Sequence, residues 1–229
     1  MRATQQSLKK SFFSVGENLS VHEWREFYEN KRLTNALGIA SSIMYHSPFI
    51  FTILRFRPKK ILEVGCGRGI HSIFLSFFTE QSVAIDANEK MINLAKTLNE
   101  KFHGRTYFEA MDGRKTNFKN KTFDVVFSQG LLEHFEDEDI RTFVDEWLRI
   151  SKVCVICVPS AEFGTQEFGN ERLMEIKDYA RILKNHSIQY YFYYGFKPQE
   201  RGVSLNNFSQ SFKVLNPKKY NSQLLMAIC

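Results

Sequence analysis

Three glycines within five residues form the most chemically informative motif in this sequence. Gly65, Gly67 and Gly69 lie in the run Glu-Val-Gly-Cys-Gly-Arg-Gly, directly after a short apolar segment. A glycine backbone turns sharply and approaches a ligand where a Cβ atom would collide. A dinucleotide-binding turn would place its third glycine where Ile70 stands, and a Walker-type phosphate loop requires Gly-Lys-Ser/Thr. The spacing therefore argues against both of these phosphate-binding turns.

Polar residues also follow the next three apolar segments. A carboxylate at the position of Asp86 can accept hydrogen bonds from both hydroxyls of a ribose, which predicts a ligand that contains a nucleoside. The acid and backbone amide of Asp112-Gly113 suit an adenine edge, and Gln129 would flank whatever is attached to the ribose.

The elements that must position these residues are short strands that alternate with amphipathic helices. One predicted helix carries Ile70, Ile73, Phe74 and Phe77, and another begins after the N-cap residue Asn88. Alternation of this kind predicts an α/β fold with a doubly wound, mostly parallel sheet and helices on both faces. The last two strands have no clear helix between them and are expected to pair antiparallel at one edge. Seven strands are predicted: 61–64, 83–86, 106–110, 123–128, 152–158, 189–194 and 223–228.

The motifs in this order resemble the class I S-adenosylmethionine-dependent methyltransferases. The resemblance rests on EVGCGRG, AIDANEKMI and FDVVFSQGLLEHF and covers about residues 59–159. It implies a seven-stranded sheet with an antiparallel last strand, S-adenosylmethionine as cofactor, and methyl transfer to an oxygen, nitrogen or carbon atom. In that family the glycine turn passes under the methionine part of the cofactor, an acid supports the turn, and the later motifs bind ribose, adenine and the methionine backbone. Carried over residue by residue, the predicted cofactor-binding residues are Glu63, Gly65, Gly67, Gly69, Asp86, Ala87, Asp112, Gly113 and Gln129.

The region before the first strand is predicted to be helical, with a break or kink at Pro48. We expect residues 1–57 to form a helical extension or lid and residues 58–229 to form the methyltransferase domain. Tyr28 and Tyr45 are candidate cofactor-binding residues of the lid, although simple packing explains them equally well.

Methyl transfer from a sulfonium requires mainly that the acceptor be positioned in line and that water be excluded. A general base is needed only where the acceptor must lose a proton, and His134 is the candidate. The competing interpretation is that Glu133 and His134 only order their loop. His71, at the start of the first crossover helix, could contact the cofactor, but a role at the surface or as a cap is favoured. Residues 163–172 are the segment where this family varies for substrate, so Glu167, Asn170 and Glu171 either contact the acceptor or cap the next helix.

Composition narrows the remaining possibilities. The 31 Lys and Arg against 25 Asp and Glu give a net charge of +6, but the basic residues are scattered in small clusters and no nucleic-acid motif accompanies them. Four cysteines, no signal-peptide core near the N-terminus and no apolar run of membrane-spanning length predict a cytoplasmic protein without membrane association. Cys154 and Cys157 are three apart within one strand and should face opposite sides, which argues against a metal site.

The acceptor is expected to be a small molecule, with a protein possible and a nucleic acid less favoured. The fourth strand is not followed by the Asn/Asp-Pro-Pro-aromatic motif of amino-methylating nucleic-acid enzymes, and the Pro-Cys nucleophile of cytosine-carbon enzymes is missing. Two alternatives remain: an NAD-dependent oxidoreductase on a related sheet, and a non-catalytic binding subunit with a methyltransferase fold.

Overall fold

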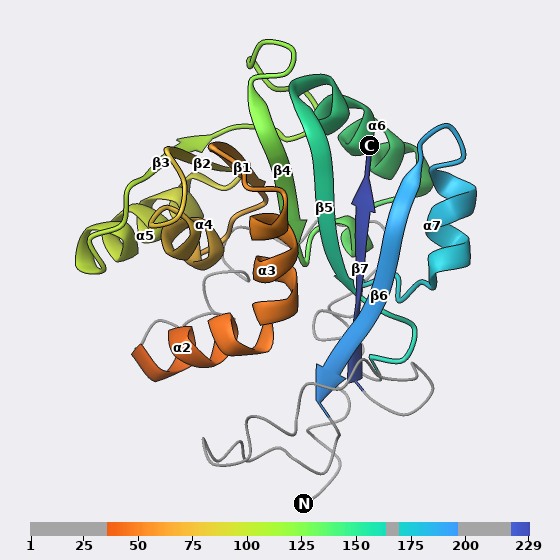
Figure 1. The fold of residues 1–229 in the computed structure, drawn as a ribbon, viewed down its shortest axis with the longest axis horizontal. Helices are drawn as coiled ribbons and strands as arrows, with labels where there is room; N and C mark the ends of the chain where they lie inside the picture. Colours follow the sequence, from red (N-terminus) through yellow and green to blue (C-terminus); the bar gives the residue numbers. More distant parts are fainter. Residues whose placement is uncertain (1–35, 164–169, 197–220) are drawn as a thin grey trace, which may run out of the picture.

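Seven strands form one mixed sheet in the order β3-β2-β1-β4-β5-β7-β6 (Figure 1). The computed structural model describes residues 36–163, 170–196 and 221–229. Each neighbouring pair among the first five strands is parallel, and β7 runs antiparallel to both of its neighbours. The strands are β1 (Lys60–Val64), β2 (Gln81–Asp86), β3 (Thr106–Ala110), β4 (Phe123–Gln129), β5 (Ser151–Pro159), β6 (Ile188–Phe196) and β7 (Asn221–Ile228).

The predicted sheet is confirmed, including the antiparallel last strand. The sequence did not indicate which of the last two strands forms the edge of the sheet. Strand β7 lies between β5 and β6, so β6 forms the edge (Figure 1). Burial explains the order. The side chains from Gln223 to Ile228 are all buried, whereas the ring of Tyr191 on β6 is 51% exposed. A strand that is apolar on both faces is stabilised at an interior position, and an edge strand tolerates partly exposed aromatic residues.

Helices cover both faces of the sheet. On one face, α3 (Ser47–Arg55), α4 (Ile70–Leu75) and α5 (Glu89–Lys101) supply buried apolar residues; on the other, α6 (Asp137–Ile150) and α7 (Ile176–Ile182) do so. Strand β5 shows the alternation that separates the two cores. Cys154 belongs to the core with α6, and Cys157 belongs to the core with α3. The prediction that these cysteines face opposite sides is therefore confirmed.

The chain before β1 forms α2 (Ala36–Tyr45) and then α3, with the break at His46 and Pro48 in the first turn of α3. Proline suits this position because the first helical N–H groups have no partner within the helix. Phe49 and Ile53 of α3 are fully buried against the sheet. Within the described residues, no single helix is long and apolar enough to cross a membrane; α2 and α3 pass that test only as a pair bent by 61°.

One helix is shorter than the sequence predicted. Helix α4 ends at Leu75, so Phe77 lies outside it and is 50% exposed. The guanidinium of Arg105 donates to the backbone oxygen of Ser76 at 2.6 Å, and the Arg105 N–H donates to the Ser76 hydroxyl at 3.0 Å. These contacts hold the chain where it leaves α4 and turns toward β2. The helix therefore ends earlier than the apolar periodicity of the sequence predicts.

Candidate active site

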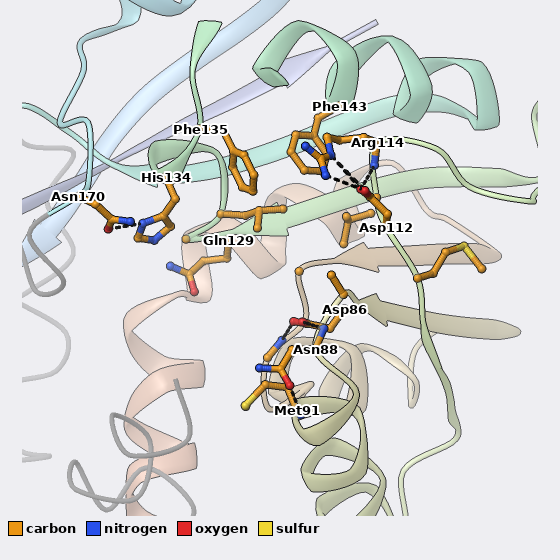
Figure 2. Close-up of a pocket in the computed structure, with 18 residues that line it drawn as sticks. Asp86, Asn88, Met91, Asp112, Arg114, Gln129, His134, Phe135, Phe143 and Asn170 are labelled. Carbon is orange, nitrogen blue, oxygen red and sulfur yellow. Dashed lines mark hydrogen bonds and ion pairs between the residues drawn. The ribbon is translucent and has the colours of Figure 1, made fainter. Parts of the chain in front are cut away.

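A cavity of about 330 Å³ opens at the carboxyl ends of β1, β2, β3 and β4 (Figure 2). Ligands of open α/β sheets bind at the carboxyl ends of the strands, at the point where the strand order reverses. Figure 2 shows Asp112 and Arg114 at one end of the cavity and His134 with Asn170 at the other. The cavity brings together nine of the residues singled out in the sequence: Gly65, Gly67, Asp86, Ala87, Asp112, Gly113, Gln129, His134 and Asn170.

The glycine turn borders the cavity, and its three glycines have left-handed backbone conformations. Gly65, Gly67 and Gly69 have φ angles of 68°, 49° and 68°, a region that residues with a Cβ atom rarely adopt. The N–H of Cys66 donates to the carbonyl of Ile85 at 3.1 Å, which fastens the turn to β2. A Cβ atom on Gly65 would lie 2.8 Å from the side chain of Leu131, which also lines the cavity.

Asp86 connects the turn to the next helix. Its Oδ2 accepts from the N–H of Gly67 at 2.9 Å, and its Oδ1 accepts from the N–H of Asn88 at 2.8 Å. Burial raises the pKa of Asp86, and the two backbone hydrogen bonds oppose this shift. Each carboxylate oxygen has a second acceptor site, so the group can still accept from vicinal hydroxyls. Asn88 caps α5 as predicted, since its side chain accepts from the N–H groups of Lys90 and Met91.

The turn after β3 forms another wall. The Arg114 guanidinium binds the Asp112 carboxylate, with Nη2 at 2.8 Å from Oδ2, and these hydrogen bonds lower the pKa of Asp112. The indole N–H of Trp147 donates to the carbonyl of Gly113 at 3.0 Å. A Cβ atom on Gly113 would lie 2.3 Å from Cγ1 of Val64, so only glycine fits at this position.

The opposite end of the cavity is polar and largely uncharged. His134 Nδ1 lies 2.9 Å from Oδ1 of Asn170, which joins the loop after β4 to the segment after β5. Burial lowers the pKa of His134, so the imidazole is neutral at pH 7. Since an amide oxygen only accepts, the proton lies on Nδ1 and the lone pair on Nε2. Beside it, burial raises the pKa of Glu133 to about 8.

Three of the predicted cofactor-binding residues that the structure describes do not line this cavity. Glu63 is buried behind the turn, where it accepts from the Ser72 N–H at 3.1 Å and holds the first turn of α4 on β1. Gly69 is packed so closely that a Cβ atom would lie 2.4 Å from the ring of Phe108. The ring of Tyr45 packs against His46, with centroids 4.8 Å apart. Tyr28, like Glu167 in the predicted acceptor segment, lies outside the described residues.

The structure adds cavity residues that sequence reasoning missed. In the sequence Arg114 begins a run of basic residues, and only its contact with the distant residue Asp139 distinguishes it from them. His71 corrects another expectation: it is buried rather than at the surface, with Nδ1 3.4 Å from Oε1 of Glu63. The further lining residues are Val64, Asn88, Met91, Met111, Arg114, Gly130, Leu131, Phe135 and Phe143.

The comparison with protein families decides between the remaining fold-level alternatives. Residues 61–153 match the family model described as a methyltransferase domain. This segment is similar to a methyltransferase domain. The match confirms the resemblance seen in the motifs and favours it over the oxidoreductase alternative.

Curated relatives of the methyltransferase domain include phosphoethanolamine N-methyltransferase 1 of Arabidopsis thaliana. It is 30% identical over 140 residues, which cover 56% of this chain and 28% of that protein. The chain spans less than a third of the length of the curated relatives it matches.

Solved structures agree with the fold over most of the chain. The PH0226 protein of Pyrococcus horikoshii OT3 superposes with a TM-score of 0.66 at 18% identity, covering 89% of this chain and 97% of that one. A SAM-dependent methyltransferase from Aquifex aeolicus superposes with a TM-score of 0.61 at 14% identity, covering 92% and 98%. These likenesses establish the methyltransferase fold for the described sheet and helices.

The residues of the cavity fit S-adenosylmethionine, the cofactor of this family. Gly65 and Gly67 present bare backbone where side chains would fill the space, and Gly113 has no room for a Cβ atom. Asp86 offers acceptors for ribose hydroxyls, and Asp112 with Gly113 offers an acid and a peptide group for a base. Apolar side chains between these polar groups suit the flat faces of a purine.

Proposed function

We propose that this chain transfers a methyl group from S-adenosylmethionine to a small-molecule acceptor. The observation that carries the proposal is the convergence of four strand ends on one cavity. The glycine turn, Asp86, Asp112-Gly113 and Gln129 are far apart in sequence, yet they line a single cavity at the edge of the sheet where ligands bind.

When bound, S-adenosylmethionine supplies a methyl group that its sulfonium has already activated, so the protein's task is chiefly positioning. Asp86 and the Asp112-Gly113 turn would hold the nucleoside, and the glycine turn and Gln129 would hold the methionine portion. These residues would fix the position of the cofactor relative to the incoming acceptor.

His134 is proposed as the proton acceptor for the incoming substrate. It lies at the far end of the cavity from Asp112, its imidazole is neutral because burial lowers its pKa, and Asn170 fixes its tautomer with the lone pair on Nε2. As the methyl group is transferred, the acceptor's proton would pass to His134 Nε2.

A small-molecule acceptor is supported by the names of the relatives. One relative is named for N-methylation of phosphoethanolamine, and one structural neighbour is named for methylation of magnesium protoporphyrin IX. We leave the acceptor atom as nitrogen, oxygen or carbon.

The test of cofactor binding is calorimetric titration with S-adenosylhomocysteine. Wild type should bind, and Asp86→Ala should weaken binding by about 100-fold, because two hydrogen bonds to a charged group are lost. Asp145→Ala is the matched control, since this carboxylate is 63% exposed on α6 and pairs with His186 away from the cavity. An inability of folded wild type to bind this ligand would refute the proposal.

The test of catalysis is transfer of labelled methyl from S-adenosylmethionine to small molecules of a cell extract. His134→Gln should lower the turnover number by about 100-fold while leaving the affinity for S-adenosylhomocysteine unchanged, as expected for loss of a general base. Unchanged turnover would assign His134 to ordering its loop. Binding without transfer to any extract component would favour the non-catalytic subunit.

A further inference from the structure

We infer that the amino-end edge of the sheet is a docking surface for anionic lipid membranes. Exposed basic and aromatic side chains gather there, and we call them the amino-edge surface: Arg55, Arg57, Lys60, Phe77, Phe78 and Arg105. They come from the ends of the segments that lead into β1, β2 and β3, so the surface lies at the opposite edge of the sheet from the cavity (Figure 1). The inference is therefore independent of the proposed function.

Hydrogen bonds to the backbone make this surface continuous. The N–H groups of Glu80 and Gln81 both donate to the carbonyl of Lys59 at 2.9 Å, which joins the turn before β2 to the turn before β1. The guanidinium of Arg105 donates to the carbonyl of Ser76 at 2.6 Å, which joins the segment before β3 to the same turn. Side chains from three separate parts of the chain are thereby held next to one another.

Two consecutive phenylalanines give the surface its apolar part. Phe77 and Phe78 directly follow each other after α4, and they are 50% and 57% exposed. Helix α3 adds Phe51, which is 68% exposed, and Arg55 lies one helical turn later on the same face of that helix. Isolated exposed apolar residues are ordinary, but neighbouring ones beside polar groups are typical of interaction sites.

The charge of the surface favours an anionic partner. Residues 55–60 include Arg55, Arg57 and Lys60 among four basic residues and contain no acid. The two acids nearest to this run in the structure are already paired with lysines: Glu80 with Lys59 at 2.9 Å, and Asp124 with Lys152 at 2.7 Å. Basic side chains at the surface of an anionic bilayer are attracted to it, and apolar rings beside them enter the boundary between headgroups and acyl chains.

The aromatic residues favour a membrane over a nucleic acid, which the same charge would also attract. Stacking on a base requires a free ring face. The guanidinium carbon of Arg105 lies 5.9 Å from the centroid of the Phe77 ring, and the rings of Phe74 and Phe78 lie 5.3 Å apart, so both exposed rings already have a partner on one side. The sequence predicted no membrane association because it has no apolar run of spanning length, but peripheral docking needs no such run.

The experiment is co-sedimentation of the full chain with vesicles of phosphatidylcholine alone and of phosphatidylcholine mixed with phosphatidylserine. Wild type should bind the mixed vesicles at least about 10-fold more tightly, and raised salt should weaken this binding. Phe77→Ser combined with Phe78→Ser should weaken binding to the mixed vesicles by about 10-fold or more, because two half-exposed rings no longer leave water. Arg57→Gln combined with Lys60→Gln should weaken it by about 5-fold for each charge.

Matched controls remove the same groups from other parts of the surface. Tyr191→Ser removes a ring that is 51% exposed on β6, at the far end of the strand order from β3. Lys177→Gln combined with Arg181→Gln removes two exposed positive charges from α7. Both controls should keep the wild-type affinity. Phe78→Trp should show blue-shifted fluorescence with the mixed vesicles, which reports entry of the ring into the bilayer and which attraction between charges alone does not produce.

Circular dichroism verifies that each variant is folded. Failure of wild type to bind the mixed vesicles overturns the inference, as does binding that both double variants retain. Equal weakening by the controls also overturns it, since the attraction would then belong to the net charge or to exposed rings in general. If single-stranded RNA or an acidic protein binds through these residues while the vesicles do not, the surface belongs to that partner and the membrane inference is wrong.

Discussion

The carboxyl group of Glu133 provides the sharpest quantitative prediction, because its environment disfavours ionisation. Glu133 is 3% exposed on the loop after β4, and its Oε2 has no hydrogen-bond partner within the described structure. Burial, with repulsion from Glu171 as a smaller contribution, raises its pKa from 4.5 to about 8. The nearby Nε2 of His134, at 3.9 Å from Oε1, is too distant for a hydrogen bond that would stabilise the charge.

The sign of the resulting pH dependence follows from proton counting. Between pH 4.5 and about 8 the native state holds a proton on Glu133 that the unfolded chain has released. The free energy of unfolding therefore falls as pH rises through this window, by about 1.4 kcal/mol per pH unit. Across the window this amounts to several kcal/mol, with about 5 kcal/mol as the upper bound.

Glu133→Gln removes this titration while preserving the shape of the side chain. We expect the variant to gain several kcal/mol relative to wild type between pH 5 and pH 8, measured by chemical denaturation at unit pH intervals. Glu138→Gln, which changes an exposed carboxyl at the start of α6, should follow the wild-type curve. Parallel curves for wild type and Glu133→Gln would show that Glu133 is ionised in the native protein and would refute the burial argument.

Two further substitutions test the packing of the site. Gly113→Ala places a Cβ atom 2.3 Å from Cγ1 of Val64. We expect the variant to lose about 1–3 kcal/mol of unfolding free energy and to bind S-adenosylhomocysteine more weakly. A variant with wild-type stability and affinity would contradict the close packing. Asn88 is the N-cap of α5, and its Oδ1 accepts from the Lys90 N–H at 3.0 Å. Asn88→Ala removes this hydrogen bond and should lower the unfolding free energy by about 1 kcal/mol, measured by thermal or chemical denaturation. Asn93→Ala, within the same helix, is the control for the loss of a side-chain amide.

The sequence allowed the sheet and the cofactor half of the cavity to be predicted because both depend on local patterns. A parallel strand buried on both faces appears as an apolar run, and the residue that follows it must lie at the ligand-binding edge. Asp86, Asp112 and Gln129 were therefore placed from position alone. The position of β7 between β5 and β6 could not be predicted in this way, because periodicity identifies a strand but not its neighbours.

The residues that sequence reasoning misplaced or missed depend on contacts between distant segments. His71 is buried because Glu63 lies beside its Nδ1 and because His46 and Phe49, from the segment before β1, pack against its ring. Arg114 sits in a run of basic residues that is typical of a solvated surface. Its orientation becomes apparent only when α6 brings Asp139 within 3.1 Å. No local spacing encodes either arrangement.

The two ends of the cavity differ in the same way: one is formed by local strand ends, and the other by contacts between distant segments. The end proposed to hold the cofactor is built from turns that directly follow strands, so sheet formation alone positions Gly67, Asp86 and Asp112. The acceptor end is built by docking one segment on another: His134 contacts Asn170, and the Arg172 N–H donates to the carbonyl of Glu133 at 2.7 Å. Changes in the segment after β5 can therefore reshape the acceptor end without disturbing the residues proposed to hold S-adenosylmethionine. On this basis we expect Asn170→Ala to alter the affinity for the methyl acceptor far more than the affinity for S-adenosylhomocysteine.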